Sequence, residues 1–184
     1  MTDRIESDHD EEIHGRRDAA SAPSRQSTDP ARKSRVRPRI PDFDYTGRYA
    51  YHLEVNTNHR RPVLTGAVAD AIIADLARAA DATSFELMAY MVMPDHVHIL
   101  ALGVSDEANA LSFMQRFKQL TGYRFARDHP KPFWQQSFFD RALRRDEDLL
   151  PIARYIFGNP IEAGLIAPGG EWPHQGGTLM AGVQ

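Results

Sequence analysis

From residue 49 onward, apolar and polar side chains recur in patterns that predict a short series of strands and helices. Residues 49–56 alternate, with Tyr51, Leu53 and Val55 on one face, which predicts a strand. Alanine and other apolar residues then return at helical spacing, which predicts a helix. The elements expected in order are a strand at 49–56, a helix at 66–80, strands at 85–93 and 96–102, a helix at 109–127, a strand at 137–143, and a last helix from about 146 to 159.

The order of these elements predicts the fold class. Strand, helix, strand, strand, helix, strand is the ferredoxin-like split βαβ pattern, an α+β fold with an antiparallel sheet and two helices on one face. Pro94 and Asp95 form the turn between the second and third strands. Pro160 is expected to end the last helix, because a residue that precedes proline disfavours helix. We expect this last, C-terminal helix to cover the other face of the sheet.

The ends of the chain differ from this middle part. Residues 1–41 are polar and contain few large apolar side chains, so they are expected to be a disordered tail. A basic cluster at 32–39 fits either contact with a phosphate backbone or a solvated linker. Residues 42–168 are expected to form the folded domain, and the glycine-rich residues 169–184 a loose tail.

Composition limits the classes of protein that the chain can represent. With 184 residues, 42% of them hydrophobic, it fits one globular domain. The absence of cysteine excludes disulfides and cysteine-based zinc sites. With no apolar run of about 18 residues and no signal-peptide pattern, we expect no membrane partner and a cytoplasmic location. Net charge is -3, and -4 without residues 1–41, so any DNA-binding surface must arise from local placement of charge.

Two histidines within the third strand are the first candidate for chemistry. His96 and His98 are separated by one residue, so in an extended strand both side chains lie on the same face. Two imidazoles one strand repeat apart can hold one divalent metal ion, and burying them without a partner would be costly. The pair predicts a metal site, although His-x-His alone is a weak signal.

The last helix carries a second pair of polar side chains. Tyr155 and Asn159 are four residues apart and share one side of the helix. If the helix covers the histidine face, it offers a phenol and an amide oxygen to the same metal, and a tyrosine oxygen beside a cation is a credible nucleophile. The alternatives are a packing tyrosine and an asparagine that caps the helix.

Three motifs in this order resemble a known family: residues 93–98 (Met-Pro-Asp-His-Val-His), residues 133–140 (Phe-Trp-Gln-Gln-Ser-Phe-Phe-Asp), and residues 155–160 (Tyr-Ile-Phe-Gly-Asn-Pro) followed by Ala163-Gly164-Leu165. Together they resemble the HUH single-tyrosine transposases, and most of all the REP-associated tyrosine transposases. Residues 51–53 and 58–62 are similar to that family's first strand and loop.

The resemblance implies specific roles and a reaction. His96 and His98 would be the metal-binding pair, Tyr155 the nucleophile, and Asn159 a third metal ligand. It implies metal-dependent cleavage and rejoining of single-stranded or hairpin DNA through a 5′-phosphotyrosine link. A site of mixed nitrogen and oxygen ligands favours Mg²⁺ or Mn²⁺. Because coordinating histidine must be neutral, activity is expected to fall as the pH drops through the imidazole range. A monomer and a homodimer both remain open.

Basic and aromatic residues supply candidates for DNA contact. Phe138 and Phe139 could stack on unpaired bases, but one of them must face the core of the sheet. His52, on the first strand, would border the site. The candidate phosphate contacts are Arg116 and Lys118 on the second helix, which also carries Arg124 and Arg127, and Arg141, Arg144 and Arg145 after Asp140. The alternative is that these basic residues form a solvated face.

Two other functional classes fit the sequence less well than the family resemblance does. A phosphoesterase with paired His-x-Thr motifs would need a second motif that this chain lacks. A non-catalytic nucleic-acid-binding module on the same fold usually carries exposed aromatics on its central strands, where this chain carries histidines. Tyr90 and Tyr123 are competing nucleophiles, but neither pairs with a polar residue on a helix that could cover the histidines.

Overall fold

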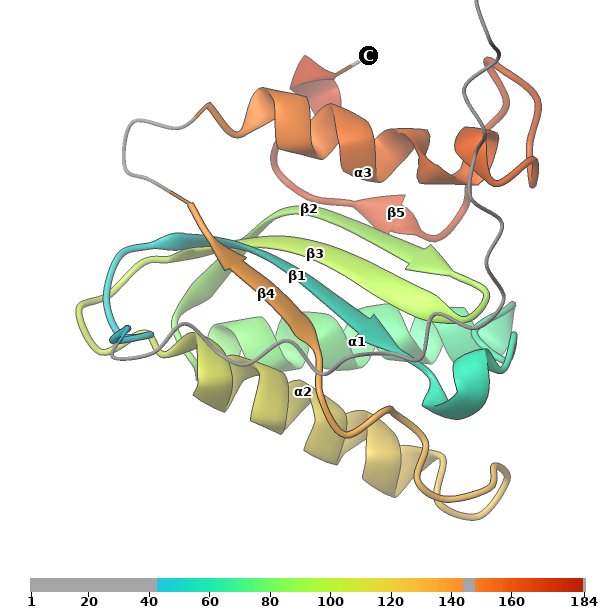
Figure 1. Ribbon diagram of the computed structural model, residues 1–184, viewed down its shortest axis with the longest axis horizontal. Helices are drawn as coiled ribbons and strands as arrows, with labels where there is room; N and C mark the ends of the chain where they lie inside the picture. The colour runs from blue at the N-terminus through green and yellow to red at the C-terminus, as the bar shows by residue number, and fades with distance from the viewer. Residues whose placement is uncertain (1–42, 144–147, 184) are drawn as a thin grey trace, which may run out of the picture. The chain divides into compact units, whose positions relative to one another are not determined.

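A computed structural model describes residues 43–143 and 148–183. These residues form a five-stranded antiparallel sheet in the order β4-β1-β3-β2-β5, with α1 and α2 on one face and α3 on the other (Figure 1). The elements are β1 (Ala50–Asn56), η1 (Asn58–Arg60), α1 (Ala67–Ala82), β2 (Phe85–Met93), β3 (His96–Gly103), α2 (Ala110–Arg124), β4 (Phe139–Ala142), α3 (Leu150–Glu162), β5 (Gln175–Gly176) and η2 (Met180–Gly182).

The larger hydrophobic core lies between the sheet and the helices α1 and α2. Alternation along β1 and β3 sends every second side chain into it, so that Tyr51 and Leu53 of β1 and Ile99 of β3 are fully buried. Ile72 of α1 and Phe113 of α2 pack against them. The other side chains of β1 and β3 therefore face α3.

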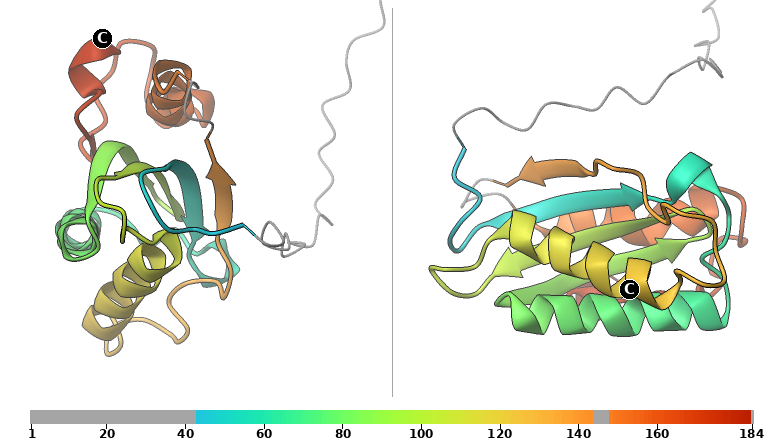
Figure 2. Two further views of the ribbon diagram at one scale, coloured as in Figure 1. Left: turned by 90° about the vertical axis from the view of Figure 1, so that its left-hand side faces the viewer. Right: turned by 90° about the horizontal axis from the view of Figure 1, so that it is seen from below.

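A second, smaller core holds α3 on the opposite face. It is built by apolar side chains of α3, β2 and β3, whose fully buried members include Met91, Leu100 and Ile156. The turned view in Figure 2 shows α3 lying over the sheet on the side away from α1 and α2. The helix is thus fixed above the face that carries His96 and His98.

The predicted fold class is confirmed, with α3 in the expected place, but the predicted end of this helix is wrong. The helix continues through Pro160 to Glu162. Proline cannot donate to the carbonyl of Ile156, and the side-chain Nδ2 of Asn159 donates to that carbonyl instead (3.3 Å) and also to that of Tyr155 (2.8 Å).

Gly164 marks the actual end of α3. Its φ of +67° is a left-handed conformation that glycine adopts without strain. Its N–H donates to the Ile161 carbonyl, and that of Leu165 donates to the Pro160 carbonyl. These two bonds form a Schellman motif, which closes the helix five residues beyond Asn159.

The expectation of a loose tail at 169–184 is wrong for most of that segment. β5 pairs with β2, and the Trp172 indole N–H donates to the Val92 carbonyl at 2.9 Å. A side chain at Gly176 would overlap the Tyr90 ring, so glycine is required where the tail approaches β2. The N-terminal tail at 1–41, with its basic cluster, lies outside the described residues.

Candidate active site

His96 and His98 lie on the face of β3 that α3 covers, as the alternation predicted. Their Nε2 atoms are 3.0 Å apart. The side chain of His98 is 2% exposed and that of His96 is 13% exposed. The Nδ1 of His96 lies 2.6 Å from Oδ1 of Asp95, which directs the proton of this ring to Nδ1 and a lone pair to Nε2.

The spacing of the two imidazoles suits a shared cation. Two ligand atoms that meet a metal at right angles, each at about 2.1 Å, are separated by about 3.0 Å. The described residues contain no cluster of three or more His, Asp or Glu side chains arranged to hold a metal ion. A third protein ligand would therefore have to be another kind of donor, and the amide oxygen of Asn159 is of the right kind.

The position of Asn159 fits this role. Its side-chain nitrogen is used by the α3 carbonyls, which leaves the oxygen to face away from the helix backbone. The side chain of Asn159 raises the pKa of His98, against the larger lowering by burial. The three predicted ligands, His96, His98 and Asn159, thus lie on the same face of the sheet.

The electrostatic setting keeps His98 neutral. Its pKa is lowered to about 3, mainly by burial and in addition by the neighbouring His96 and His52, while Asn159 raises it. A neutral imidazole is the form that coordinates a metal. For His98, the loss of metal binding in acid is therefore expected well below the ordinary imidazole range named from the sequence.

Two carboxylates and one guanidinium surround the histidines. Glu54 of β1 is the register partner of His98, and its Oε2 lies 3.9 Å from Nδ1 of His98. Arg60 joins both acids, with Nε 3.1 Å from Asp95 and Nη1 3.8 Å from Glu54, and it also donates to Asn56. Sequence reasoning missed Glu54 and Arg60, although the alternation that placed His52 on this face also places Glu54 there.

Tyr155 projects from α3 toward the same face. Its ring centroid lies 5.9 Å from that of His98 and 5.9 Å from that of His52, in edge-to-face geometry. Burial raises the pKa of Tyr155, and the charges of Glu54 and Glu162 add to this effect. With its pKa raised, the phenol is neutral at neutral pH. Tyr155 is 48% exposed and therefore open to a substrate.

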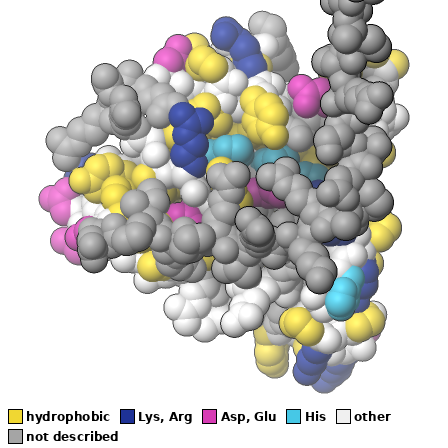
Figure 3. Space-filling model, viewed as in Figure 1, with side chains coloured by type: hydrophobic (Ala, Val, Ile, Leu, Met, Phe, Trp, Pro, Cys, Tyr) yellow, Lys and Arg dark blue, Asp and Glu magenta, His cyan; other side chains and the backbone are white. Residues whose placement is uncertain are grey.

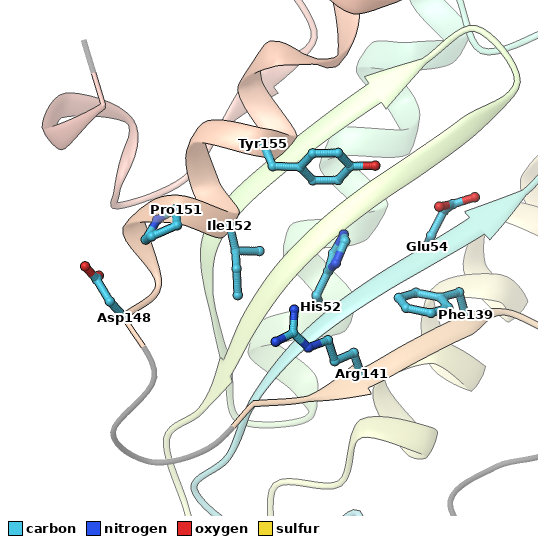
Figure 4. A pocket seen from close by; sticks show the side chains of 8 residues that line it. All are labelled: His52, Glu54, Phe139, Arg141, Asp148, Pro151, Ile152 and Tyr155. Atoms are coloured by element: carbon cyan, nitrogen blue, oxygen red, sulfur yellow. The ribbon is translucent and has the colours of Figure 1, made fainter. Parts of the chain in front are cut away.

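A groove of about 620 Å³ runs beside Tyr155 between α3 and the strands β1 and β4. Figure 4 shows the Tyr155 ring reaching over the sheet, with His52 below it and Arg141 next to His52. On the surface, histidine side chains are visible here with basic and hydrophobic side chains beside them (Figure 3). The residues that line the groove are His52, Glu54, Phe139, Arg141, Asp148, Pro151, Ile152 and Tyr155.

Only some of the basic residues predicted to contact DNA lie at this groove. Arg141 lines the groove, but Arg116 lies on α2, on the opposite side of the sheet. Lys118 is also on α2, where its Nζ donates to the carbonyls of residues 135, 136 and 137 at 2.7–3.4 Å. Arg144 and Arg145 lie outside the described residues.

Phe138 and Phe139, the two candidates for base stacking, lie on opposite faces of the sheet. Phe139 faces the groove, whereas Phe138 packs against the larger core. Of the competing tyrosines, Tyr90 also packs against the larger core, and Tyr123 is 88% exposed on α2. Both lie apart from the histidine face.

The family model for IS200-like transposases matches residues 45–159, which include the histidine pair, Tyr155 and Asn159. This chain belongs to the IS200-like transposase family. In the part of the chain that the structure describes, no helix is long and apolar enough to cross a membrane.

Two curated relatives of this chain are named as REP-associated tyrosine transposases. The chain is 29% identical over 101 residues to a protein assigned to that group in Haemophilus influenzae, covering 49% of this chain and 57% of the relative. It is 29% identical over 90 residues to the REP-associated tyrosine transposase of Escherichia coli K12, covering 48% and 52%. The chain thus spans little more than half the length of these curated relatives.

One solved structure has the same fold. It is a REP-associated tyrosine transposase bound to a REP hairpin, which superposes with a TM-score of 0.65 at 21% identity, over 76% of this chain and 82% of that one. The match shows that this chain shares the overall fold of that structure.

Proposed function

We propose that this protein cleaves and rejoins single-stranded DNA, with Tyr155 as the nucleophile and a 5′-phosphotyrosine link as the intermediate. The observation that carries the proposal is the placement of the Tyr155 ring 5.9 Å from the ring of His98, which itself pairs with His96. The phenol of Tyr155, the imidazoles of His96 and His98 and the amide of Asn159 lie on one face. Membership in a transposase family makes DNA the expected substrate.

The chemical step is a transesterification. The Tyr155 oxygen forms a bond to the phosphorus of the scissile phosphodiester, the bond to the 3′ oxygen breaks, and that oxygen takes a proton and leaves as a 3′-hydroxyl. The phenol proton passes to water or to Glu54, whose charge acts on the phenol. A 3′-hydroxyl can reverse the step and rejoin the strand, because the phosphodiester bond energy is kept in the link.

A divalent cation fits the proposed site. His96, His98 and Asn159 would hold Mg²⁺ or Mn²⁺, and when bound the ion would supply positive charge to the phosphate oxygens. The carboxylate of Asp95 orients the ring of His96 through its Nδ1. A carboxylate that binds the other ring nitrogen of a histidine usually strengthens the binding of metal by that histidine.

Hairpin DNA is the proposed partner. The solved relative that shares this fold is bound to a REP hairpin, and the curated relatives are REP-associated tyrosine transposases. We extend this partner to the present chain, whose groove beside Tyr155 is open to a single strand.

Capture of the covalent intermediate tests the proposal. The protein is incubated with Mg²⁺ or Mn²⁺ and labelled hairpin DNA with single-stranded flanks, then denatured and run on a gel. We expect a DNA–protein adduct that disappears in Tyr155→Phe and in the presence of chelator. Tyr123→Phe is the matched control, since Tyr123 is exposed on α2, and it should retain the adduct.

An adduct that persists in Tyr155→Phe would refute the assignment of the nucleophile. DNA binding without any adduct under these conditions would instead favour a non-catalytic nucleic-acid-binding module on the same fold.

A further inference from the structure

The groove between α3 and β4 extends beyond the groups proposed to react. Some of the residues that line it have no role in the proposed reaction. Tyr155 and Glu54 border one part of it, whereas Pro151, Ile152 and Phe139 add an apolar lining that makes no contribution to bond breaking. We propose that this groove is a subsite for one unpaired nucleobase of the DNA strand, next to the scissile phosphate. This inference rests on the proposed function, since it places the base beside the nucleophile.

His52 provides a polar atom in the groove with which a bound base could form a hydrogen bond. Its side chain stands among the lining residues of the groove, although the residue is only 9% exposed. Among the residues that the structure describes, none makes a hydrogen bond to its Nε2. A buried polar atom left without a partner is costly, and native structures seldom keep one unless a ligand or water completes it. The edge of a nucleobase carries the N–H, ring nitrogen and carbonyl groups that would complete this bond.

Phe139 supplies the stacking surface. It lies on the edge strand β4, opposite Glu54 in the register, and its ring contacts that of His52 edge-to-face at 5.8 Å. The side chain is half-buried at the wall of the groove and does not belong to either core. Aromatic rings on a sheet surface are the usual platforms on which unpaired bases stack.

The dimensions and position of the groove agree with such an occupant. Its volume of about 620 Å³ lies within the range of small-ligand pockets, roughly 300–1,000 Å³. Tyr155 lines the same groove, so a base held between Phe139 and Ile152 would belong to a nucleotide adjacent to the phosphate under attack. The subsite would therefore help to choose which phosphodiester bond is presented to Tyr155.

A binding measurement that needs no covalent chemistry tests the subsite. All variants are made in the Tyr155→Phe protein, which keeps the ring but removes the nucleophilic oxygen. Single-stranded oligonucleotides carry the fluorescent base 2-aminopurine at one position at a time, and each is titrated with protein. We expect one position whose fluorescence changes on binding, because the base leaves the DNA stack for the groove.

Phe139→Ala should weaken binding about tenfold and abolish the fluorescence change, in line with the usual contribution of base–aromatic stacking. An oligonucleotide abasic at that position should bind both proteins equally. Phe138→Ala is the matched control, because Phe138 is the neighbouring aromatic on the opposite face of the sheet. Phe139→Leu and His52→Leu, each verified by thermal melting, provide a second pair of variants if Phe139→Ala does not fold.

The outcomes separate the subsite from the proposed function. If Phe138→Ala and Phe139→Ala lose the signal equally, or if neither Phe139→Ala nor His52→Leu alters it, the subsite is refuted. If the native protein forms the Tyr155 adduct but no position responds to binding, the subsite is refuted and the proposed function stands. A position-specific response without any adduct would retain the subsite and refute the reaction.

Discussion

The Nε2 atoms of His96 and His98 face each other at 3.0 Å, and the opposite nitrogen of each ring points toward a carboxylate, Asp95 for His96 and Glu54 for His98. The two contacts differ in length, 2.6 Å for the first and 3.9 Å for the second. Both rings nevertheless turn Nε2 toward the same point, so that one cation could meet both nitrogens.

We expect the native protein to bind Mn²⁺ and His98→Gln to bind it more than about 100-fold more weakly, because one of the two nitrogen ligands is lost. Paramagnetic resonance of free Mn²⁺ measures the affinity without any DNA. His129→Gln is the control, since His129 packs against Phe125 and Phe133 at the end of α2 and should leave the affinity unchanged. Equal affinities in all three proteins would show that the pair does not hold the ion.

The contacts of Arg60 predict an indirect effect on the same affinity. Arg60 joins Asp95 and Glu54, so its removal should free both carboxylates to move from the histidines. We expect Arg60→Ala to weaken Mn²⁺ binding about tenfold, as is typical of groups that orient metal ligands. Arg48→Ala removes another arginine that pairs with an aspartate, the exposed Asp106, and should have no effect. Unchanged Mn²⁺ binding in Arg60→Ala would show that Arg60 does not help to orient the metal ligands.

Buried neutral histidines predict a loss of stability in mild acid. The pKa of His52 is lowered to about 4 and that of His98 to about 3, whereas both titrate near 6.5 in the unfolded chain. Between pH 6.5 and about 4 the unfolded state therefore binds protons that the folded state does not. Their contribution is complete above pH 6.5 and is lost as the pH falls through this window.

Urea unfolding of the metal-free protein between pH 5 and 7 measures this effect. The slope that each of the two histidines contributes should grow as the pH falls below 6.5 and approach about 1.4 kcal/mol per pH unit near pH 5. His52→Gln removes one titrating group and should make the dependence shallower by that amount. The same slope in both proteins would mean that His52 takes up its proton in the folded state.

The Asp75–Arg124 pair predicts a purely structural effect. Arg124 donates from Nε and Nη2 to the two carboxylate oxygens of Asp75 at 2.7 and 2.6 Å, and the Asp75 side chain is 1% exposed. Arg124→Ala should lower the free energy of unfolding by about 3 kcal/mol, because it leaves a buried charge with poor compensation. Arg78→Ala, which removes a longer and more exposed contact to Asp75, should cost less than about 1 kcal/mol. Equal losses in urea unfolding would contradict this ranking.

The sequence was sufficient for the parts of the site that follow from periodicity. Alternation along the third strand placed His96 and His98 on one face, and helical spacing placed Tyr155 and Asn159 on one side of a helix. Both of these relations are local. The order of the elements then predicted that the helix with Tyr155 and Asn159 covers the face with the two histidines. The fold class followed from the same order.

Other features depend on contacts that no local pattern encodes. Lys118 was a reasonable DNA contact by charge, but its ammonium group is bonded to the carbonyls of a loop whose path only the folded chain reveals. The choice between Phe138 and Phe139 required the register of β4 on β1. β5 is two residues long and includes a glycine, so it has too little sequence to produce a recognisable alternation.

Pro160 connects the backbone of α3 to the chemistry of the site. By leaving the Ile156 carbonyl without its usual partner, it draws the amide nitrogen of Asn159 back along the helix. The same nitrogen donates to the Tyr155 carbonyl, so both bonds direct the amide oxygen away from the helix backbone. Aspartate at position 159 has no side-chain N–H and could make neither bond. A residue that ordinarily interrupts a helix thus provides a carbonyl that binds the Asn159 amide through its nitrogen, and the oxygen is the atom that a cation would meet.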